Sequence, residues 1–309
     1  MRKICLLLII VLSLIFTGVA SASEYTVAVC AAAVHHEFSY LATKGAIDTL
    51  EKAGIDVIFT EAGGDELQQV AQIESAIQRD VDALIIHGIT AAGIQGTVKK
   101  AALKNIPIVC IDVPLTGDNV IATVSSDNYE AGLEMARYLV GRLGGEGNIV
   151  AMYTPGIPVL DYRYRMLRLV LEDFPKIKIV AELPWRAPAY TQSSMDEMEM
   201  FLKANPQKGA IDAIWSAADM PAIGAAMAIS KAGREDEMFI ISMDALPEAL
   251  ELIKAGPHFA ATVAQRPYEM GISAAEAVIN HFAGREVLRW EYVPFTLVTQ
   301  YNVDEFIKK

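Results

Sequence analysis

Short apolar runs alternate with amphipathic stretches along nearly the whole chain. Within 65–79, for example, Leu67, Val70, Ile73 and Ile77 recur at helical spacing and share one face of a helix. The apolar runs are short and almost uninterrupted, which is typical of strands buried on both faces of a parallel sheet. We therefore predict an α/β fold whose parallel sheets are covered by helices on both sides.

The expected elements form two successive rounds, with a restart near 125–128. In the first round we expect strands at 25–30, 57–60, 83–87 and 108–111 and helices at 38–53, 65–79 and 91–104. In the second we expect strands at 149–152, 177–183, 213–216 and 239–243 and helices near 128–142, 163–172, 193–204, 222–231 and 246–254. The length of 309 residues also suits two domains better than one. The pattern thus predicts two doubly wound, Rossmann-like parallel-sheet lobes with a ligand cleft between them.

Two of the apolar strands run directly into an aspartate, one in each round. Asp112 follows the run 108–111, and Asp244 ends the run 239–244. The carboxyl ends of parallel strands border the crevice in which open α/β sheets bind their ligands. Because an ionised carboxylate only accepts hydrogen bonds, we expect both walls of the cleft to suit a small molecule rich in hydroxyl groups. A cap on the loop that follows each strand is the alternative role.

The N-terminus has the pattern of an export signal. Arg2 and Lys3 precede an apolar run over 4–16, and small residues follow at 20–22. The run is shorter than the roughly 20 residues of a membrane span. We expect a cleavable signal peptide over 1–22 and a periplasmic mature protein.

The net charge, the cysteines and the absence of known motifs reduce the number of function classes that suit this sequence. Loss of Arg2 and Lys3 would move the formal net charge from −12 to −14, which argues against nucleic acid as a partner. Cys30 and Cys110 are expected to be free, buried thiols. The chain lacks the G-x-S-x-G, P-loop, C-x-x-C and H-E-x-x-H motifs, and 145–147 fails the dinucleotide fingerprint. We predict no enzyme and no cofactor, although the two aspartates could mimic a glycosidase pair.

Several stretches together resemble the sugar-binding periplasmic solute-binding proteins, the ribose-binding-protein-like family. They are 65–68 with 72–74, 81–86, 105–109 leading into Asp112, 125–128 with 131–132, Met243-Asp244, and 261–265. The resemblance implies a chain that crosses three times between its lobes. The N-terminal lobe would comprise 24–125 plus 266–292, and the C-terminal lobe 127–264 plus 293–309. The crossings would form a hinge about which the lobes close over a ligand.

The resemblance also implies which side chains bind the ligand, besides the two aspartates. Arg163, expected to open a helix, matches an arginine that grips ring and hydroxyl oxygens through its planar donors. Gln265 matches the hinge glutamine, with a backbone-bracing role as the alternative. Phe38 and Tyr190 match aromatics that cover the C–H side of a sugar, and His36 stands in the first binding loop. Weaker candidates are His35, His87, Trp185, Trp215 and Asp219, and core packing is the alternative for every aromatic.

Three positions depart from the ribose-type pattern. Val113, Ser39 and Ala218 stand where that family commonly has an arginine, an aromatic and an asparagine. The replacements at Val113 and Ala218 remove donors, and the three departures together argue against ribose. A sugar alcohol, a cyclitol, a deoxy sugar or a less polar small metabolite remains open.

His35, His36 and His87 are all expected near Asp112. Zinc would need about three converging protein ligands, and hydrogen-bonding histidines are commoner in binding clefts, so we predict no metal. If these histidines contact the ligand, its affinity would vary with pH.

We predict a monomeric receptor that delivers its ligand to the permease of an inner-membrane ABC importer. The alternative is a receptor whose closed form is presented to a chemoreceptor or a sensor kinase.

Overall fold

The computed structural model describes residues 24–307 except 36, 89, 187 and 188. The expected signal peptide and the candidate His36 therefore lie outside the described residues. Within the described part, no helix is both long and apolar enough to span a bilayer.

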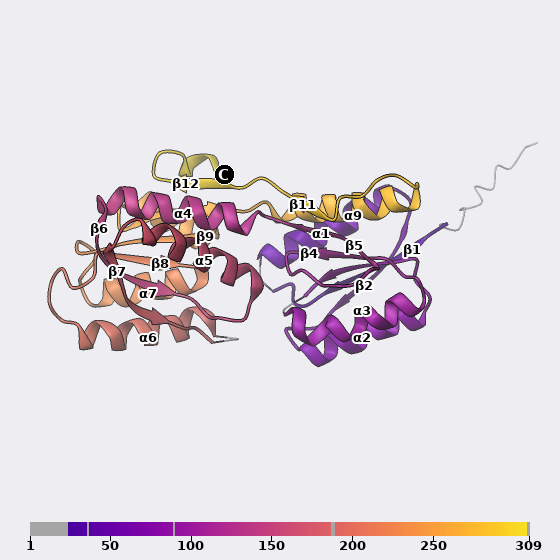
Figure 1. The fold of residues 1–309 in the computed structure, drawn as a ribbon, viewed down its shortest axis with the longest axis horizontal. Helices are drawn as coiled ribbons and strands as arrows, with labels where there is room; N and C mark the ends of the chain where they lie inside the picture. Colours follow the sequence, from indigo (N-terminus) through magenta and orange to yellow (C-terminus); the bar gives the residue numbers. More distant parts are fainter. Residues whose placement is uncertain (1–23, 36, 89, 187–188, 308–309) are drawn as a thin grey trace, which may run out of the picture.

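Two six-stranded sheets form the two lobes (Figure 1). The first sheet has the order β11-β5-β4-β3-β1-β2 with every neighbouring pair parallel. The second has the order β12-β10-β9-β8-β6-β7, in which only β12 runs antiparallel to its neighbour. The first lobe contains β1 (Thr26–Ala31), α1 (Glu37–Lys52), β2 (Asp56–Glu61), α2 (Glu66–Gln78), β3 (Ala83–His87), α3 (Ala91–Leu103), β4 (Ile108–Ile111), β5 (Val120–Ser125), α9 (Pro267–Phe282) and β11 (Trp290–Tyr292). The second contains α4 (Asn128–Leu143), β6 (Glu146–Met152), α5 (Pro158–Glu172), β7 (Lys176–Leu183), α6 (Tyr190–Ala204), β8 (Ala213–Ser216), α7 (Asp219–Lys231), β9 (Phe239–Asp244), α8 (Pro247–Ala255), β10 (Phe259–Ala264), β12 (Thr296–Thr299) and a short 3₁₀ helix, η1 (Val303–Glu305).

Helices cover both faces of each sheet, as the continuous apolar strands predict. Along β1 the side chains alternate, so Val27 and Val29 pack towards α1 and α9, whereas Ala28 and Cys30 pack towards α2 and α3. Cys30 and Cys110 are both buried and free of disulfides, and burial raises the pKa of each thiol to about 11. The predicted fold class is confirmed.

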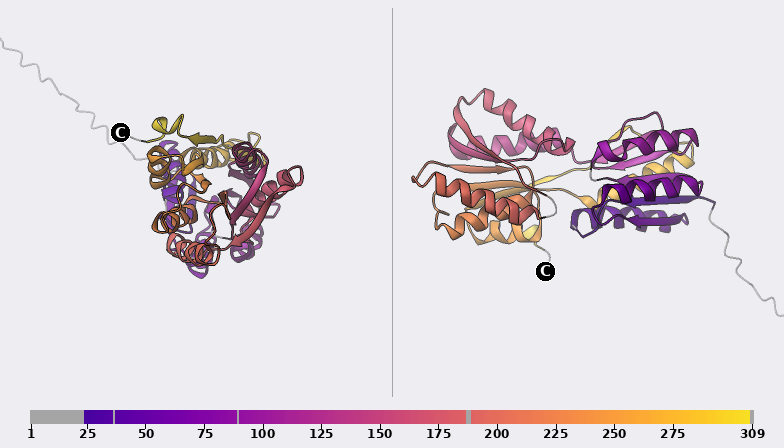
Figure 2. Two further views of the ribbon diagram at one scale, coloured as in Figure 1. Left: turned by 90° about the vertical axis from the view of Figure 1, so that its left-hand side faces the viewer. Right: turned by 90° about the horizontal axis from the view of Figure 1, so that it is seen from below.

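The chain passes between the two sheets three times: from β5 to α4, from β10 to α9, and from β11 to β12 (Figure 2). Each passage is only two or three residues long between its flanking elements. The second view in Figure 2 shows two bodies joined by these thin connections. The division into rigid lobes at the predicted boundaries stays a prediction.

The structure corrects the expected elements in two respects. Helix α5 begins at Pro158 rather than at Arg163, and proline is favoured in a first helical turn because it lacks a backbone N–H. Arg163 therefore lies inside the helix and not at its start. The expected set also omitted β5, β10, β11, β12 and α9.

Candidate functional site

The two strand-terminal aspartates share an unusual backbone conformation. Asp112 has φ 65° and Asp244 has φ 131°, and Ala245 after it has φ 57°. Residues other than glycine seldom adopt positive φ, and such strained positions concentrate at binding and catalytic sites. Each strand thus turns sharply at its aspartate, at the carboxyl edge of its sheet.

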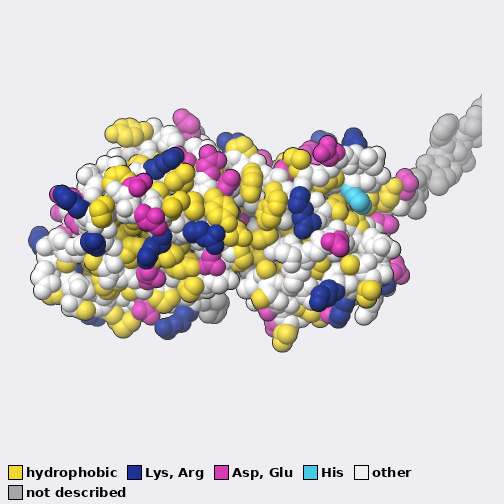
Figure 3. Space-filling model, viewed as in Figure 1, with side chains coloured by type: hydrophobic (Ala, Val, Ile, Leu, Met, Phe, Trp, Pro, Cys, Tyr) yellow, Lys and Arg dark blue, Asp and Glu magenta, His cyan; other side chains and the backbone are white. Residues whose placement is uncertain are grey.

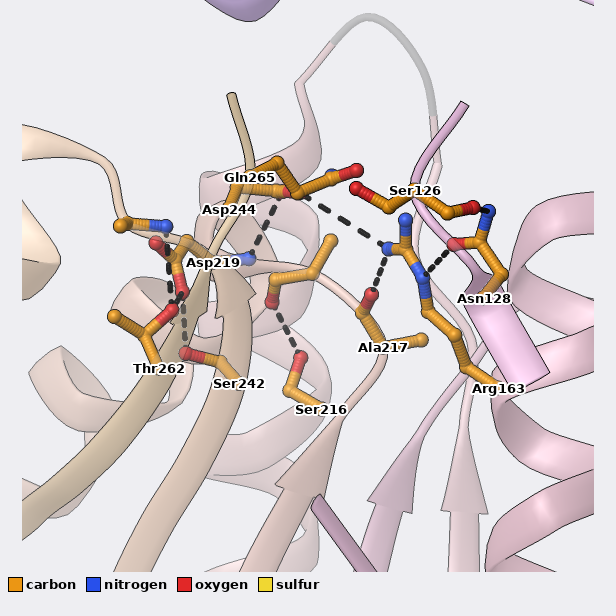
Figure 4. A network of polar contacts seen from close by, with 12 residues as sticks. Ser126, Asn128, Arg163, Ser216, Ala217, Asp219, Ser242, Asp244, Thr262 and Gln265 are labelled. Atoms are coloured by element: carbon orange, nitrogen blue, oxygen red, sulfur yellow. Dashed lines mark hydrogen bonds and ion pairs between the residues drawn. The ribbon is translucent and has the colours of Figure 1, made fainter. Parts of the chain in front are cut away.

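Arg163 is almost completely buried, with 2% of its surface exposed. Its Nε donates to Oδ1 of Asn128 at 2.8 Å, and its Nη1 donates to the carbonyl of Ala217 at 2.7 Å. In Figure 4 the third nitrogen points into the space between Gln265 and Ser126. The guanidinium is therefore fixed by two neighbours while one edge faces the candidate site.

A glycine lets the helix that carries Arg163 come close to α4. A Cβ at Gly132 would lie 2.7 Å from Cα of Arg163 and 2.8 Å from its carbonyl oxygen, distances that real Cβ atoms do not reach. Gly132 on α4 thus sets the depth at which α5 places the guanidinium.

Asp244 accepts hydrogen bonds from two residues, Gln265 and Asp219. Nε2 of Gln265 donates to its Oδ1 at 2.8 Å, and the backbone N–H of Asp219 donates to its Oδ2 at 3.4 Å. Burial raises the pKa of Asp244, although the charge of Arg163 and the bond from Gln265 act in the opposite direction. Gln265 lies between β10 and α9, so this bond ties Asp244 to a passage between the sheets.

Asp219 is fully buried, and its carboxyl group accepts hydrogen bonds from residues of its own lobe. Its Oδ1 accepts from the hydroxyls of Ser242 and Thr262, and its Oδ2 accepts from the backbone N–H of Leu246 at 2.7 Å. Burial, together with the nearby charge of Asp244, raises the pKa of Asp219 to about 7. This carboxyl group braces the loop after β9, which presents Asp244, so a direct role in binding is not supported by its contacts.

Three buried polar atoms at the site have no hydrogen-bond partner among the described residues. They are Oδ1 of Asp112, Oε1 of Gln265 and Oγ of Ser126. Burial raises the pKa of Asp112 to about 6, with Arg163 opposing the shift and Asp244 adding to it. Buried polar atoms in folded proteins are nearly always paired, so unpaired ones at a cleft point to a missing partner.

Two cavities flank this group of side chains. A cavity of about 310 Å³ is bordered by Phe38 of α1 together with Asp244 and Gln265, so it contacts elements of both lobes. A second cavity of about 230 Å³ is bordered by Asp112 and Ser126. The candidate site therefore borders elements of both lobes.

The remaining predicted residues lie at various distances from this centre. The ring of His87 is centred 5.9 Å from that of Phe38 and tilted by 47°, and His35 is exposed. Trp215 is completely buried in the core of the second sheet, where its ring packs against Tyr164. Trp185 is 6% exposed and exchanges hydrogen bonds with Thr154, and Tyr190 begins α6 half-buried. Trp185, Trp215 and Tyr190 border neither cavity.

The structure adds two residues that were not predicted as site residues. Ser126 and Asn128 lie where β5 passes into α4, and the amide of Asn128 bonds both Arg163 and the carbonyl of Ser126. The sequence analysis noted this stretch as the restart between the two rounds and as part of the family resemblance, but nothing in its pattern shows that its side chains face Arg163. Among the described residues, no group of three His, Cys, Asp or Glu side chains is arranged to hold a metal ion.

Comparison with known proteins agrees with this architecture. The family model described as "Periplasmic binding protein domain" matches residues 27–286. The ribose import binding protein RbsB of Bacillus subtilis (strain 168) is 28% identical over 278 residues, covering 90% of this chain and 88% of that protein. The xylitol-binding protein of Mycolicibacterium smegmatis is 26% identical over 283 residues, covering 88% of this chain and 78% of that protein.

A solved structure is similar as well. An ABC transporter solute binding protein from Agrobacterium vitis with bound allitol has a TM-score of 0.86 and 32% identity, and the match covers 93% of this chain and 99% of that one. These matches confirm the resemblance inferred from the sequence. The chain belongs to the periplasmic binding protein family, and it is a solute-binding protein and not an enzyme.

Proposed function

We propose that this protein captures a sugar, polyol or cyclitol between its lobes and delivers it to an inner-membrane ABC importer. Two of the similar proteins are named for ribose and xylitol, and the third was solved with bound allitol; all three are small molecules rich in hydroxyl groups. The observation that carries the proposal is the buried Oδ1 of Asp112, which has no donor among the described residues. A ligand hydroxyl would supply that donor.

The hydrogen-bonding capacities of the site favour hydroxyl groups in particular. Asp112, Asp244 and the Oε1 atom of Gln265 offer acceptors, and the guanidinium of Arg163 offers donors. A hydroxyl group both donates and accepts, so adjacent hydroxyls on one ligand can satisfy both kinds of group. Val113 and Ala218 add no donors, which supports a ligand other than ribose.

Contacts on both sides of the cleft would couple binding to closure. Asp112 follows a strand of the first sheet, and Asp244 and Arg163 belong to the second. A ligand that contacts all three gains its full binding energy only when the two lobes approach each other. In the predicted division, the N-terminal lobe comprises 24–125 with 266–292, and the C-terminal lobe comprises 127–264 with 293–309. The ligand would therefore shift the population towards the closed form, which is the form that an importer permease would accept after export of the protein to the periplasm.

A thermal-shift screen tests the proposal. The purified protein is heated with sugars, sugar alcohols, cyclitols and, for contrast, amino acids and nucleosides. We expect at least one polyhydroxy compound to raise the melting temperature with concentration, since a ligand that binds only the folded state stabilises it by mass action. A response restricted to amino acids or nucleosides, or no response across the polyhydroxy set, would contradict the proposed ligand class.

A further inference from the structure

Apolar side chains gather where the two lobes meet, and on the face shown in Figure 3 they lie beside the junction. The larger of the two cavities, of about 310 Å³, has apolar side chains on both of its walls. Phe38 and Leu41 of α1 belong to the first lobe. The apolar residues of the second lobe come from α8, the loop before it and the C-terminal segment, and they are Leu246, Pro247, Leu250, Phe306 and Ile307.

The polar side chains that border this cavity are few. Asp244 and Gln265 belong to the candidate site, so the cavity adjoins the groups that are expected to bind ligand hydroxyls. Glu37 and Glu251 are exposed, so their carboxylates keep their contact with water. Among the described residues that border the cavity there is no lysine or arginine. The lining therefore does not select for a charged ligand group.

The backbone donors on the second-lobe wall are already in use. The N–H of Ala245 donates to Oγ1 of Thr262 at 3.2 Å, and the N–H of Leu246 donates to Oδ2 of Asp219 at 2.7 Å. The next residue, Pro247, has no N–H. A ligand hydroxyl placed against these residues would find no free backbone donor, and burying a polar group without its partners costs free energy. This wall therefore favours an apolar ligand group over a further hydroxyl.

The cavity also adjoins one of the passages between the lobes. Ala264, Gln265 and Pro267 border it, from the end of β10 to the start of α9. In closure about a hinge, points near the hinge move less than points far from it. Closure should therefore narrow this space less than it narrows the outer rim of the cleft. A volume of about 310 Å³ also lies within the range of about 300–1,000 Å³ that is usual for small-molecule sites.

The smaller cavity offers no comparable apolar space. Tyr129 and Tyr162 on its border stack with ring centroids 4.5 Å apart. Cζ of Arg165 lies 6.0 Å from the centroid of the Tyr129 ring. Because these rings already contact one another and a guanidinium, an apolar ligand group fits the larger cavity better.

We propose that the natural ligand is a polyhydroxy compound that carries an uncharged apolar substituent, an alkyl or aryl group, and that this substituent occupies the larger cavity. The inference rests on the proposed function, because the hydroxyl groups of the same ligand bind Asp244, Gln265 and Arg163. The substituent contacts Phe38 and Leu41 on one wall and the apolar side chains of α8 and the C-terminal segment on the other. Each methylene group buried in this way strengthens binding about fourfold.

A series of ethers tests the inference in the unaltered protein. Isothermal titration calorimetry compares ribose, xylitol, allitol and myo-inositol with derivatives in which each hydroxyl in turn carries a butyl or a 2-methoxyethyl group. The two groups have the same length, but the 2-methoxyethyl group is more polar. We expect at least one butyl ether to bind at least about tenfold more tightly than its parent. The matching 2-methoxyethyl ether should gain less.

Two substitutions on opposite walls locate the effect. Leu41→Asn and Ile307→Asn each place a polar side chain at a half-buried position on the border of the cavity, and each should remove the advantage of the butyl ether over its parent. Ile47→Asn is the matched control, since Ile47 is half-buried on the same helix as Leu41 and borders a different cavity. It should leave the advantage unchanged. If one of the two cavity variants does not fold, the other still decides.

The outcomes separate this inference from the proposed function. Butyl ethers that bind no better than their parents or than the 2-methoxyethyl ethers would overturn the inference and leave the proposed function standing. An advantage that survives both cavity substitutions would do the same. If no polyhydroxy compound binds, with or without a substituent, the proposed function fails as well.

Discussion

Nη1 of Arg163 lies 4.0 Å from Oδ1 of Asp244, the same oxygen that accepts a 2.8 Å hydrogen bond from Gln265. One carboxylate oxygen is thus held by a buried guanidinium and by an amide on a passage between the sheets. The orientation of Asp244 is therefore fixed before a ligand arrives, which lowers the entropy lost on binding.

Asp244→Asn should remove binding and keep the fold. An amide in place of the carboxylate loses the charge-assisted bonds to ligand hydroxyls, and we expect affinity to fall at least about a hundredfold, or roughly 3 kcal/mol. The ligand-free protein should melt at the same or a slightly higher temperature, because burial disfavours the charged form of Asp244. Calorimetric titration and thermal melting measure the two effects. Affinity within about threefold of the wild type would remove Asp244 from the site.

Asn128→Ala should weaken binding by misplacing Arg163. The substitution leaves Nε of Arg163 without its acceptor at 2.8 Å in a buried position, which costs about 1–3 kcal/mol of stability. We expect ligand affinity to fall about tenfold because the freed guanidinium can turn. Asn128→Asp retains an acceptor and should recover part of the affinity. A variant that is destabilised but binds normally would show that Asn128 supports the fold alone.

Gly132→Ala tests whether the close approach of α4 and α5 sets the site. The added Cβ would meet Arg163 backbone atoms at 2.7 Å and 2.8 Å, so the helices must separate. We expect a loss of about 1–3 kcal/mol in the free energy of unfolding, accompanied by weaker ligand binding. Gly141→Ala on the same helix is the matched control, since no other atom lies within 4 Å of its Cβ position, and it should be neutral or stabilising by up to about 1 kcal/mol. Equal behaviour of the two variants in chemical denaturation would refute the proposed contact.

A structural feature of this protein can be predicted from the sequence when it produces a regular pattern of apolar and polar residues. Strand-terminal aspartates can be recognised because buried parallel strands are continuous apolar runs, and the residue that ends such a run lies at the ligand-binding edge. The family resemblance, and not the pattern, pointed to Arg163. Asn128 and Ser126 could not be assigned, since their role depends on how a passage between sheets faces a distant helix.

For aromatic residues, the sequence does not decide between a place in the core and a place in the binding cleft. Trp215 was a candidate for stacking on a sugar, but its ring is completely buried in the second sheet. An aromatic near the end of a strand fits the core and the cleft equally well, and the face on which it lies depends on the register of neighbouring strands. Asp219 was likewise a weak candidate, and three hydrogen bonds within its own lobe show a bracing role that local sequence could not reveal.

Ligand-free stability should fall as pH rises from about 4 to about 7. The pKa values of Asp112 and Asp219 in the folded protein, about 6 and about 7, are raised from 3.8. In this range the folded state binds more protons than the unfolded state, so the stabilisation present below pH 4 is lost as these groups ionise. Melting temperatures of wild type and Asp112→Asn should converge at low pH, with wild type the less stable above about pH 6. A difference that does not vary with pH would contradict the raised pKa of Asp112.

The proposed function requires that the two lobes close over the ligand. Small-angle X-ray scattering, with and without a ligand identified in the thermal-shift screen, tests this closure most directly. We expect the radius of gyration to decrease when the ligand saturates the wild-type protein and to stay unchanged when the same compound is added to Asp244→Asn. A wild-type scattering curve that is identical with and without saturating ligand would contradict a receptor that closes on its solute.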